Sequence, residues 1–170
     1  MDLRPFVMDV SDFPSPGILF RDITPLLASP QAFAHAIVAM ADPFRSDRPE
    51  KVLGIEARGF MFGAALAREL GIGLVPARKP GKLPRRTEGI GYGLEYGKDR
   101  LEIHTDAFRR GERVLVADDV LATGGTAAAA AELAERLGAE VLGATFLIEL
   151  AALSGRNRLP GRRVHAVLVL

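Results

Sequence analysis

Short apolar runs and longer segments with helical periodicity alternate along this chain. Runs rich in Val, Leu and Ile without polar alternation are typical of strands that are covered on both faces of a sheet. They predict strands over residues 51–55, 73–77, 113–117, 140–148 and 164–169. Apolar residues that recur at helical spacing predict a helix over residues 30–44, and residues 60–70 are also expected to be helical. Residues 127–137 consist almost entirely of strong helix formers and predict a third helix. The alternation predicts an α/β fold, with a mostly parallel central sheet flanked by helices.

Residues that begin and end helices lie at the borders of these periodic segments. Ser29 is a suitable N-cap, and Pro30 fits the first helical position, where its missing N–H leaves no hydrogen bond unmade. Gly71 follows the second periodic segment and suits the left-handed conformation that ends many helices. These residues support the predicted start of the first helix and the predicted end of the second.

The segment over residues 78–91 fits neither pattern. It contains five basic residues, two prolines and three glycines, and it predicts an exposed loop long enough to be a lid or a binding loop. After it, residues 92–95 and 100–104 favour an antiparallel hairpin that turns at residues 97–99. We therefore expect a mobile β-hairpin lid over about residues 78–104.

An apolar segment stiffened by prolines precedes the first predicted helix. Residues 12–25 contain X-Pro pairs and a glycine that restrict the path of the backbone. Such a segment could merely cap the sheet, or it could form a hood that lays backbone groups along a flat aromatic base. We expect a small N-terminal hood over about residues 1–28, within one domain that spans residues 1–170.

Composition narrows the class of protein. The content of 48% hydrophobic and 25% charged residues is typical of globular proteins, and a net charge of +1 argues against bulk binding of nucleic acid. No apolar run approaches the ~20 residues of a membrane span, and the first residues lack a signal-peptide pattern. The absence of cysteine excludes disulfides and thiolate metal sites. We expect a cytoplasmic protein that binds neither nucleic acid nor membrane.

The strand predicted over residues 113–117 leads into the most specific cluster of the chain. Asp118 and Asp119 follow it, and a turn rich in Thr and Gly connects them to an Ala-rich helix. Backbone N–H groups of such a turn and of the first helical turn favour an anion, while two carboxylates can accept hydrogen bonds from neighbouring sugar hydroxyls. Because open α/β sheets bind ligands at the carboxyl ends of their strands, this order predicts a site for a phosphorylated sugar. The turn residues expected at its phosphate are Thr123, Gly124, Gly125 and Thr126.

Each part of this cluster also has a simpler explanation. An Asp-Asp pair at a strand end occurs where carboxylates hold Mg²⁺ or accept a phosphoryl group. A Gly-Gly pair can be only a turn, and a Thr before a helix is often only an N-cap. The ordered combination of strand, acidic pair, turn and helix is what favours the sugar-phosphate site.

Three further segments contain residues that can carry chemistry. Arg58 stands at the start of a predicted helix, where it could bind a second anion or belong to an ordinary helix start. The basic residues over 78–84 could fold over a pyrophosphate and exclude water, or form a solvated loop. Glu95, between aromatic residues, could be a general acid/base near a heterocycle or an exposed residue of an edge strand.

Five blocks of the sequence, in order, resemble the type I phosphoribosyltransferase family and, within it, the adenine phosphoribosyltransferases. The resemblance runs from about Asp12 to the C-terminus and implies the type I phosphoribosyltransferase fold. The blocks are DFPSPGILFRDITPLL (12–27), EARGF (56–60), RKPGKLP (78–84), YGLEYG (92–97) and VLVADDVLATGGT (114–126).

The resemblance implies a purine salvage reaction in which 5-phosphoribosyl pyrophosphate (PRPP) and adenine give AMP and pyrophosphate. Mg²⁺ is the implied cofactor, held mainly by substrate oxygens and water, and a homodimer is the implied assembly. Asp118 and Asp119 would hold the ribose hydroxyls, and Ala122 would join the four turn residues named above at the 5′-phosphate. The residues implied for pyrophosphate are Arg58, Arg78, Lys79 and Lys82.

The resemblance also implies a base site and the acid/base chemistry. Main-chain groups of Leu19 and Arg21 would read the edge of adenine, between the apolar side chains of Phe20 and Val120. The implied catalytic residues are Glu95 as the acid/base, Tyr96 as its partner on the loop, and Arg58.

The sequence departs from the family at two positions, and two other functions compete. Relatives commonly carry an N-terminal helix where this chain has Pro5, and Gln where it has His104, which we expect to be a surface residue. A phosphoribosyltransferase for a 6-oxopurine would share the sugar-phosphate site. A PRPP-sensing regulator would share it too, but should add a DNA-binding domain or a basic face.

Overall fold

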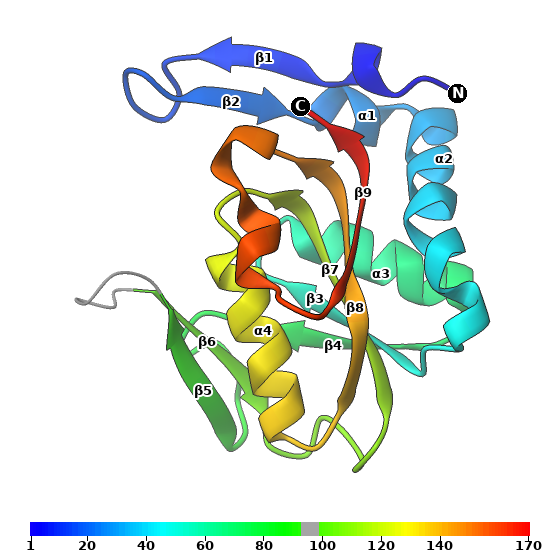
Figure 1. Ribbon diagram of the computed structural model, residues 1–170, viewed down its shortest axis with the longest axis vertical. Coiled ribbons are helices and arrows are strands. Elements are labelled where there is room, and N and C mark those ends of the chain that lie inside the picture. Colours follow the sequence, from blue (N-terminus) through cyan, green and yellow to red (C-terminus); the bar gives the residue numbers. More distant parts are fainter. Residues whose placement is uncertain (93–98) are drawn as a thin grey trace.

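The computed structural model describes residues 1–92 and 99–170, which form an α/β fold around a five-stranded parallel sheet (Figure 1). Every neighbouring pair in this sheet is parallel, with the strand order β4-β3-β7-β8-β9. The strands are β3 (Lys51–Ile55), β4 (Gly73–Ala77), β7 (Arg113–Leu121), β8 (Glu140–Glu149) and β9 (Arg163–Val169). The predicted parallel sheet is confirmed.

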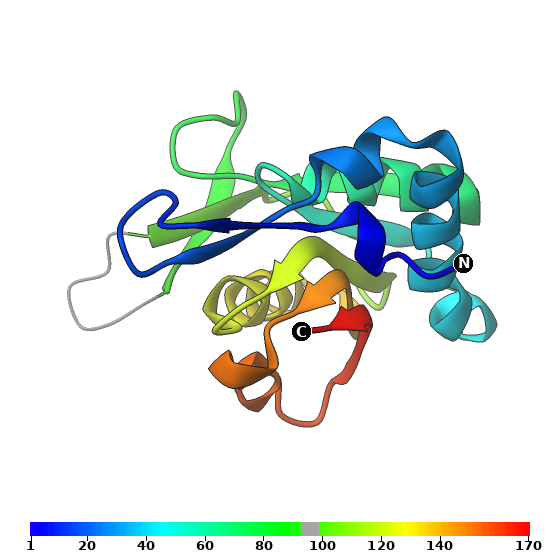
Figure 2. The same cartoon turned by 90° about the horizontal axis from the view of Figure 1, so that it is seen from above.

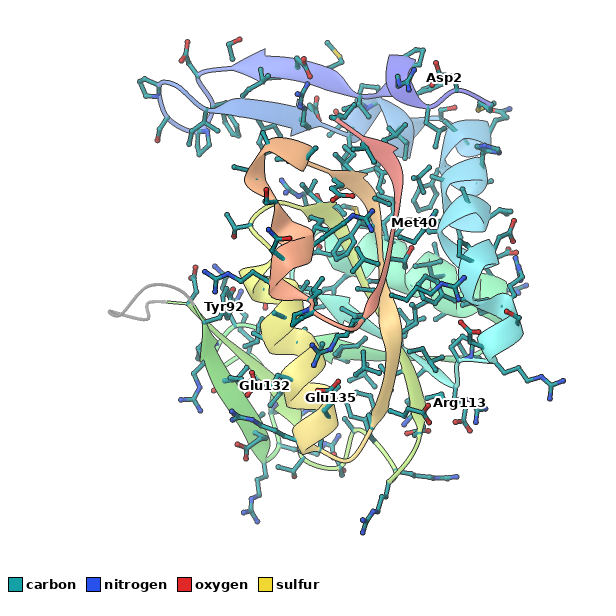
Figure 3. All side chains as sticks on the ribbon, in the orientation of Figure 1. Asp2, Met40, Tyr92, Arg113, Glu132 and Glu135 are labelled. Carbon is teal, nitrogen blue, oxygen red and sulfur yellow. The ribbon has the colours of Figure 1, made fainter. Side chains whose placement is uncertain are left out.

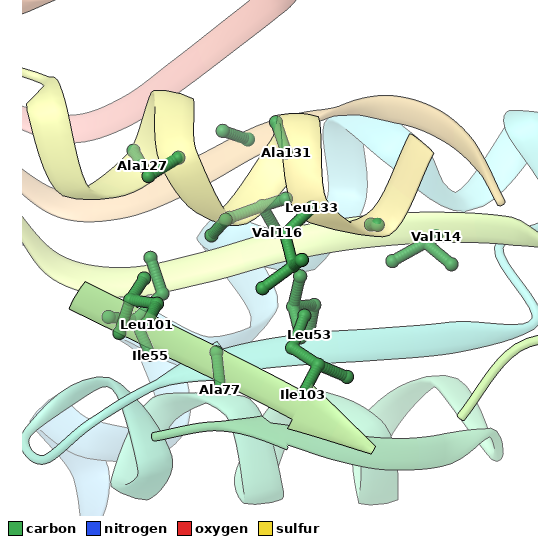
Figure 4. Close-up of a cluster of buried hydrophobic side chains, with 14 of the residues drawn as sticks. Leu53, Ile55, Ala77, Leu101, Ile103, Val114, Val116, Ala127, Ala131 and Leu133 are labelled. Atoms are coloured by element: carbon green, nitrogen blue, oxygen red, sulfur yellow. The ribbon is translucent and has the colours of Figure 1, made fainter. Parts of the chain in front are cut away.

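Helices cover both faces of the sheet. Helices α2 (Pro30–Ala41) and α3 (Gly59–Leu70) lie on one face, and α4 (Gly125–Arg136) lies on the other (Figures 1 and 2). The short elements are α1 (Thr24–Ala28) and the 3₁₀ turns η1 (Arg4–Phe6), η2 (Asp42–Asp47), η3 (Ala151–Leu153) and η4 (Gly155–Arg158). Each sheet face has its own hydrophobic core, and Figure 4 shows the one beneath α4.

The predicted roles of Ser29 and Gly71 are confirmed, whereas the predicted bounds of α2 and α4 need correction. The Ser29 hydroxyl accepts a hydrogen bond from the Ala32 N–H at 3.3 Å, and Gly71 ends α3 with a φ of +70°. Helix α2 ends at Ala41 instead of residue 44, because Pro43 has no N–H to continue the ladder and the chain tightens into η2. The helix predicted over residues 127–137 begins two residues earlier, at Gly125.

The strand order reverses between β3 and β7. From β3 the chain adds β4 on one side, whereas β7, β8 and β9 follow on the other side. The connections after β3 and β7 run in opposite directions, so a crevice forms between the carboxyl ends of these two strands. Ligands of open α/β sheets usually bind in such a crevice. The segments after β3 and at the end of β7 therefore meet at this point.

Strand β7 is longer than the sequence pattern predicts. It continues through Leu121, so Asp118 and Asp119 lie among the last residues of the strand instead of after it. Parallel pairing with β8 holds it in this form, with Asp118 opposite Phe146 and Leu121 opposite Glu149. The sequence pattern predicts a strand that ends too early, because the two carboxylates interrupt the apolar run.

The structure contains an antiparallel hairpin, but its first strand begins earlier than the sequence predicts, and residues 93–95 of the predicted strand lie outside the described residues. Strand β5 (Thr87–Tyr92) pairs antiparallel with β6 (Asp99–His104), so residues 87–91 are strand instead of loop. Glycine, here Gly89, is uncommon in strands, which is why the pattern predicts a loop here. A glycine is needed at this position because a Cβ would lie 2.6 Å from Nε of Arg100, whose side chain passes over it. The predicted turn at residues 97–99 lies mostly outside the described residues, and Asp99 begins β6.

The N-terminal segment forms an antiparallel pair above the sheet. Strands β1 (Met8–Ser11) and β2 (Leu19–Asp22) run across the carboxyl edge of the sheet (Figure 1). The rings of Phe13 and Phe20 meet edge to face, with centroids 5.0 Å apart, and fix the connection between the two strands. Before β1 the chain makes only the 3₁₀ turn η1. Among the described residues, every helix is too short or too polar to cross a membrane.

Candidate active site

A cavity of about 760 Å³ opens at the carboxyl edge of the sheet, at the reversal of strand order. It is lined by β2, the segment after β3, the basic loop after β4, the end of β5, the end of β7 with the turn after it, and the segment after β8. Eleven of the residues that the sequence singled out line it: Leu19, Phe20, Arg21, Arg58, Lys79, Lys82, Asp118, Asp119, Val120, Ala122 and Thr126. Segments that are distant in sequence thus meet in one site.

The acidic pair lies on the floor of this cavity. The Asp119 N–H donates a hydrogen bond to Oδ1 of Asp118 at 2.8 Å, and Asp119 is only 4% exposed. Burial, and then the charge and the hydrogen bond of the neighbouring Asp119 carboxylate, raise the pKa of Asp118 well above its usual value. Two carboxylates this close repel each other, and hydroxyl donors between them would relieve that repulsion.

Arg58 connects the acidic pair to strand β2. Its Nε lies 2.5 Å from Oδ2 of Asp119, although the N–H is not directed at that oxygen, which accepts no hydrogen bond from the described residues. The guanidinium also lies over the ring of Phe20, 5.2 Å from its centroid. Arg58 therefore contacts both the predicted ribose side and the predicted base side of the cavity.

A smaller recess of about 60 Å³ adjoins the acidic pair at the N-terminus of α4. Its walls include Thr123, Gly124 and Thr126, and Gly124 has a φ of +80°, a conformation that glycine adopts without strain. Gly125 begins α4 but does not line the recess, whereas Thr126 and Ala127 of the first helical turn do, and the N–H groups of that turn have no partners within the helix. Its size and its donors suit one phosphate group.

Three residues of the basic loop after β4 contact the carboxylate of Glu56. The Glu56 side chain, 7% exposed, is paired with the Lys82 ammonium, accepts the Lys79 N–H at 2.8 Å, and accepts Nε of Arg78 at 3.3 Å. Burial opposes ionisation of Glu56, but the hydrogen bonds from Lys82 and Lys79 and the charge of Arg78 lower its pKa overall. Glu56 is therefore an anion at the cavity wall.

Arg78 takes a different position from the other predicted pyrophosphate ligands. Its guanidinium is directed at Glu56 and at the carbonyl of Lys82, to which Nη1 donates at 3.2 Å. Among the described residues, Arg78 is not part of the cavity lining, whereas Lys79 and Lys82 are. A role for Arg78 at pyrophosphate stays a prediction.

The sequence patterns missed part of the lining. Ile18 and Tyr92 belong to blocks that were recognised, but were not assigned contacts. Leu150 and Leu153 follow β8, and they also line the cavity. They directly follow a strand that ends at the same edge of the sheet, and this position could have indicated that they line the site. Glu95 and Tyr96 lie outside the described residues, so their predicted roles stay predictions.

Comparisons of sequence agree with this geometry. The model of the phosphoribosyl transferase domain family matches residues 22–164. The chain is 56% identical over 168 residues to the adenine phosphoribosyltransferase of Carboxydothermus hydrogenoformans, covering 99% of each chain. It is 57% identical over 166 residues to that of Methylococcus capsulatus, covering 98% of this chain and 97% of the relative.

Solved structures give the same result. The adenine phosphoribosyltransferase from Rhodothermus marinus is 53% identical and superposes with a TM-score of 0.94, covering 99% of this chain and 96% of that one. The enzyme from Saccharomyces cerevisiae, complexed with D-2,5-dideoxy-2,5-imino-altritol 1,6-bisphosphate and adenine, is 40% identical with a TM-score of 0.90, covering 98% and 96%. The sequence resemblance is confirmed, and this chain belongs to the phosphoribosyltransferase family, in its adenine phosphoribosyltransferase branch.

Proposed function

We propose that this protein transfers the 5-phosphoribosyl group of PRPP to adenine, giving AMP and pyrophosphate. The observation that carries the proposal is the single cavity that joins the acidic pair, the phosphate-sized recess, the basic loop and the apolar hood. These four surfaces match the four chemical parts of the two substrates: ribose hydroxyls, 5′-phosphate, pyrophosphate and base.

The sugar is held by groups that favour one orientation. The carboxylates of Asp118 and Asp119 accept hydrogen bonds from the two ribose hydroxyls. The 5′-phosphate enters the recess between Ala122 and Thr126, where backbone N–H groups and the dipole of α4 favour an anion. With both ends fixed, the sugar presents C1′ to the interior of the cavity.

The pyrophosphate leaves toward the cationic side of the cavity. As the bond from C1′ to pyrophosphate breaks, negative charge grows on the departing oxygens and positive charge grows on the sugar. Arg58, Lys79 and Lys82 line the cavity, and preorganised donors of this kind are commonly worth about 3–4 kcal/mol each in a transition state. Glu56 keeps the two lysines close to this position before substrate binds.

The base lies between the hood and the end of β7. Main-chain groups of Leu19 and Arg21 meet the edge of adenine, because an edge-on backbone discriminates amino from oxo groups through donor and acceptor matching. Phe20, Val120 and the two leucines after β8 supply apolar walls. Adenine loses its N9 proton as N9 attacks C1′, and Glu95 is proposed to accept that proton.

A magnesium ion fits the donors of this site. The described residues contain no group of three side chains that could hold a metal, and Asp119 Oδ2 lies 2.5 Å from Nε of Arg58. Mg²⁺ prefers hard oxygen ligands and retains water, so oxygens of the ribose and pyrophosphate and water molecules would be its main ligands, beside the acidic pair. When bound, the ion neutralises charge on the pyrophosphate.

The proposed activity predicts a specific pattern of product release. With PRPP and Mg²⁺, we expect pyrophosphate release with adenine, but not with hypoxanthine, guanine or no base. Removal of Mg²⁺ by a chelator should stop the release. The measurement is a coupled pyrophosphate assay on the purified protein. Release with an oxopurine alone would contradict the assigned base, and tight PRPP binding without release would favour a PRPP-sensing regulator.

We further propose that the protein is a homodimer. Apolar side chains are exposed on β1 and on α3, including Met8, Val10 and Met61 at 55%, 37% and 40% exposure, and a partner surface would cover such residues. We expect sedimentation at micromolar concentration to give twice the mass of 18.2 kDa. A single species at that monomer mass would contradict the proposal.

A further inference from the structure

The segment after β8 supports the phosphate recess from behind. Gly155 in η4 is buried, and its backbone touches the loop that forms the recess. A Cβ on Gly124 would lie 2.2 Å from the Gly155 carbonyl oxygen, and a Cβ on Gly155 would lie 2.3 Å from the carbonyl oxygen of Ala122. The two backbones therefore pack directly on one another, with no side chain between them.

An ion pair holds this segment in place. Nε and Nη2 of Arg156 donate to the Glu149 carboxylate at 2.6–2.8 Å, and Nη1 donates to the carbonyl of Val164 at 2.7 Å. Glu149 ends β8, Val164 lies in β9, and the Glu149 side chain is 7% exposed. One guanidinium thus ties the residue next to Gly155 to two strands of the sheet.

The geometry points to the Glu149–Arg156 pair as a positioning device for the 5′-phosphate loop. By fixing Arg156 it fixes Gly155, and Gly155 in turn sets the position of the backbone from Ala122 to Gly124. This inference rests on the proposed function, in which that loop binds the 5′-phosphate. Neither Glu149 nor Arg156 lines the cavity, so both act through the loop and not on substrate.

The fork of the guanidinium is the essential feature. The bidentate guanidinium fixes both the distance and the orientation of Arg156 relative to the Glu149 carboxylate. A lysine ammonium at this position would keep the positive charge but would not fix the orientation. Backbone donors bind an anion strongly only where they converge, and displacements near 1 Å can cost about 10²-fold in well-oriented sites. Loss of the fork should therefore weaken phosphate binding without removing any charge.

The test separates the two ends of the substrate. In Arg156→Lys we expect the dissociation constant of ribose 5-phosphate to rise about 10-fold, while that of pyrophosphate stays unchanged, because its ligands lie on other segments. Both constants are measured by calorimetry with Mg²⁺ present. Gly155→Ala is a second variant that displaces the loop without touching the ion pair, and the same split is expected. The control is Glu135→Gln on α4 (Figure 3), which breaks the ion pair between Glu135 and Arg162.

The outcomes distinguish the inference from a general loss of structure. Unchanged affinity for ribose 5-phosphate in folded Arg156→Lys would overturn it. Equal weakening of both ligands would also overturn it, since that is the mark of a merely structural role. Thermal unfolding monitors the fold of each variant. A wild-type protein that binds ribose 5-phosphate but does not convert adenine would contradict the proposed function and leave this inference intact.

Discussion

The Asp118→Asn, Asp119→Asn double variant is expected to lose PRPP affinity by about 10²–10⁴-fold. Each carboxylate accepts a hydroxyl of the ribose in the proposed complex, and hydrogen bonds to charged groups contribute about 1.5–3 kcal/mol each. Asparagine preserves the shape of the floor, so the loss reports the charge and the acceptors. Equilibrium binding of PRPP in the presence of Mg²⁺ is the measurement.

An opposing effect acts in the same variant. Removal of two negative charges lowers the repulsion of the anionic substrate, which by itself would strengthen binding. Arg58, Lys79 and Lys82 line the same cavity, and their positive charges offset most of the repulsion between the acidic pair and the phosphates. We therefore expect the lost hydroxyl contacts to dominate.

Asp106→Asn is the matched control for this experiment. Asp106 is 62% exposed at its side chain and pairs with the exposed Arg85, away from the cavity lining. Its variant should bind PRPP like the wild type. If the double variant at the acidic pair also kept wild-type affinity, the ribose site would have to lie elsewhere.

Replacement of Glu95 by Gln is expected to lower kcat by about 10²–10⁴-fold, with a smaller change in KM for either substrate. A general base acts in the transition state, so its loss should affect turnover more than binding. Glu95 follows Tyr92, a cavity-lining residue, by three positions along the chain. Steady-state kinetics with adenine as the varied substrate measure the effect.

The pH profile supplies the second readout for Glu95. A carboxylate base must be ionised, so wild-type kcat should fall at acid pH, and this limb should be missing in Glu95→Gln. Glu88→Gln, an exposed glutamate on β5 of the same hairpin, is the control and should keep the limb. Full activity of Glu95→Gln would assign proton removal to water or to the backbone.

The sequence predicted those parts of the site that are local in the chain. Asp118 and Asp119, the turn after them and the start of α4 form one continuous segment, so their chemistry can be read without knowing the fold. Arg58 was recognisable for the same reason, since it stands where a strand gives way to a helix. Their assembly into one cavity depends on the reversal of strand order between β3 and β7, which no local pattern encodes.

The residues that escaped prediction owe their roles to packing. Gly155 looks like an ordinary loop glycine, and only its contact with Gly124 gives it a function. Leu150 and Leu153 look like core residues that continue a strand. Strand β5 was misplaced because Gly89 and Gly91 are poor strand formers by composition, whereas pairing with β6 and the crossing Arg100 side chain decide its conformation.

The base of the β5–β6 hairpin is buried, and this affects how the activity of variants in β6 is interpreted. Leu101 and Ile103 of β6 are 1% and 0% exposed, and they pack with Ile55 and Ala77 in the core beneath α4 (Figure 4). The hairpin cannot swing at its base without opening that core, so any movement of the predicted lid would involve the same side chains as cooperative unfolding. A conservative change at Leu101 would therefore alter turnover through stability alone and could be mistaken for an effect on catalysis.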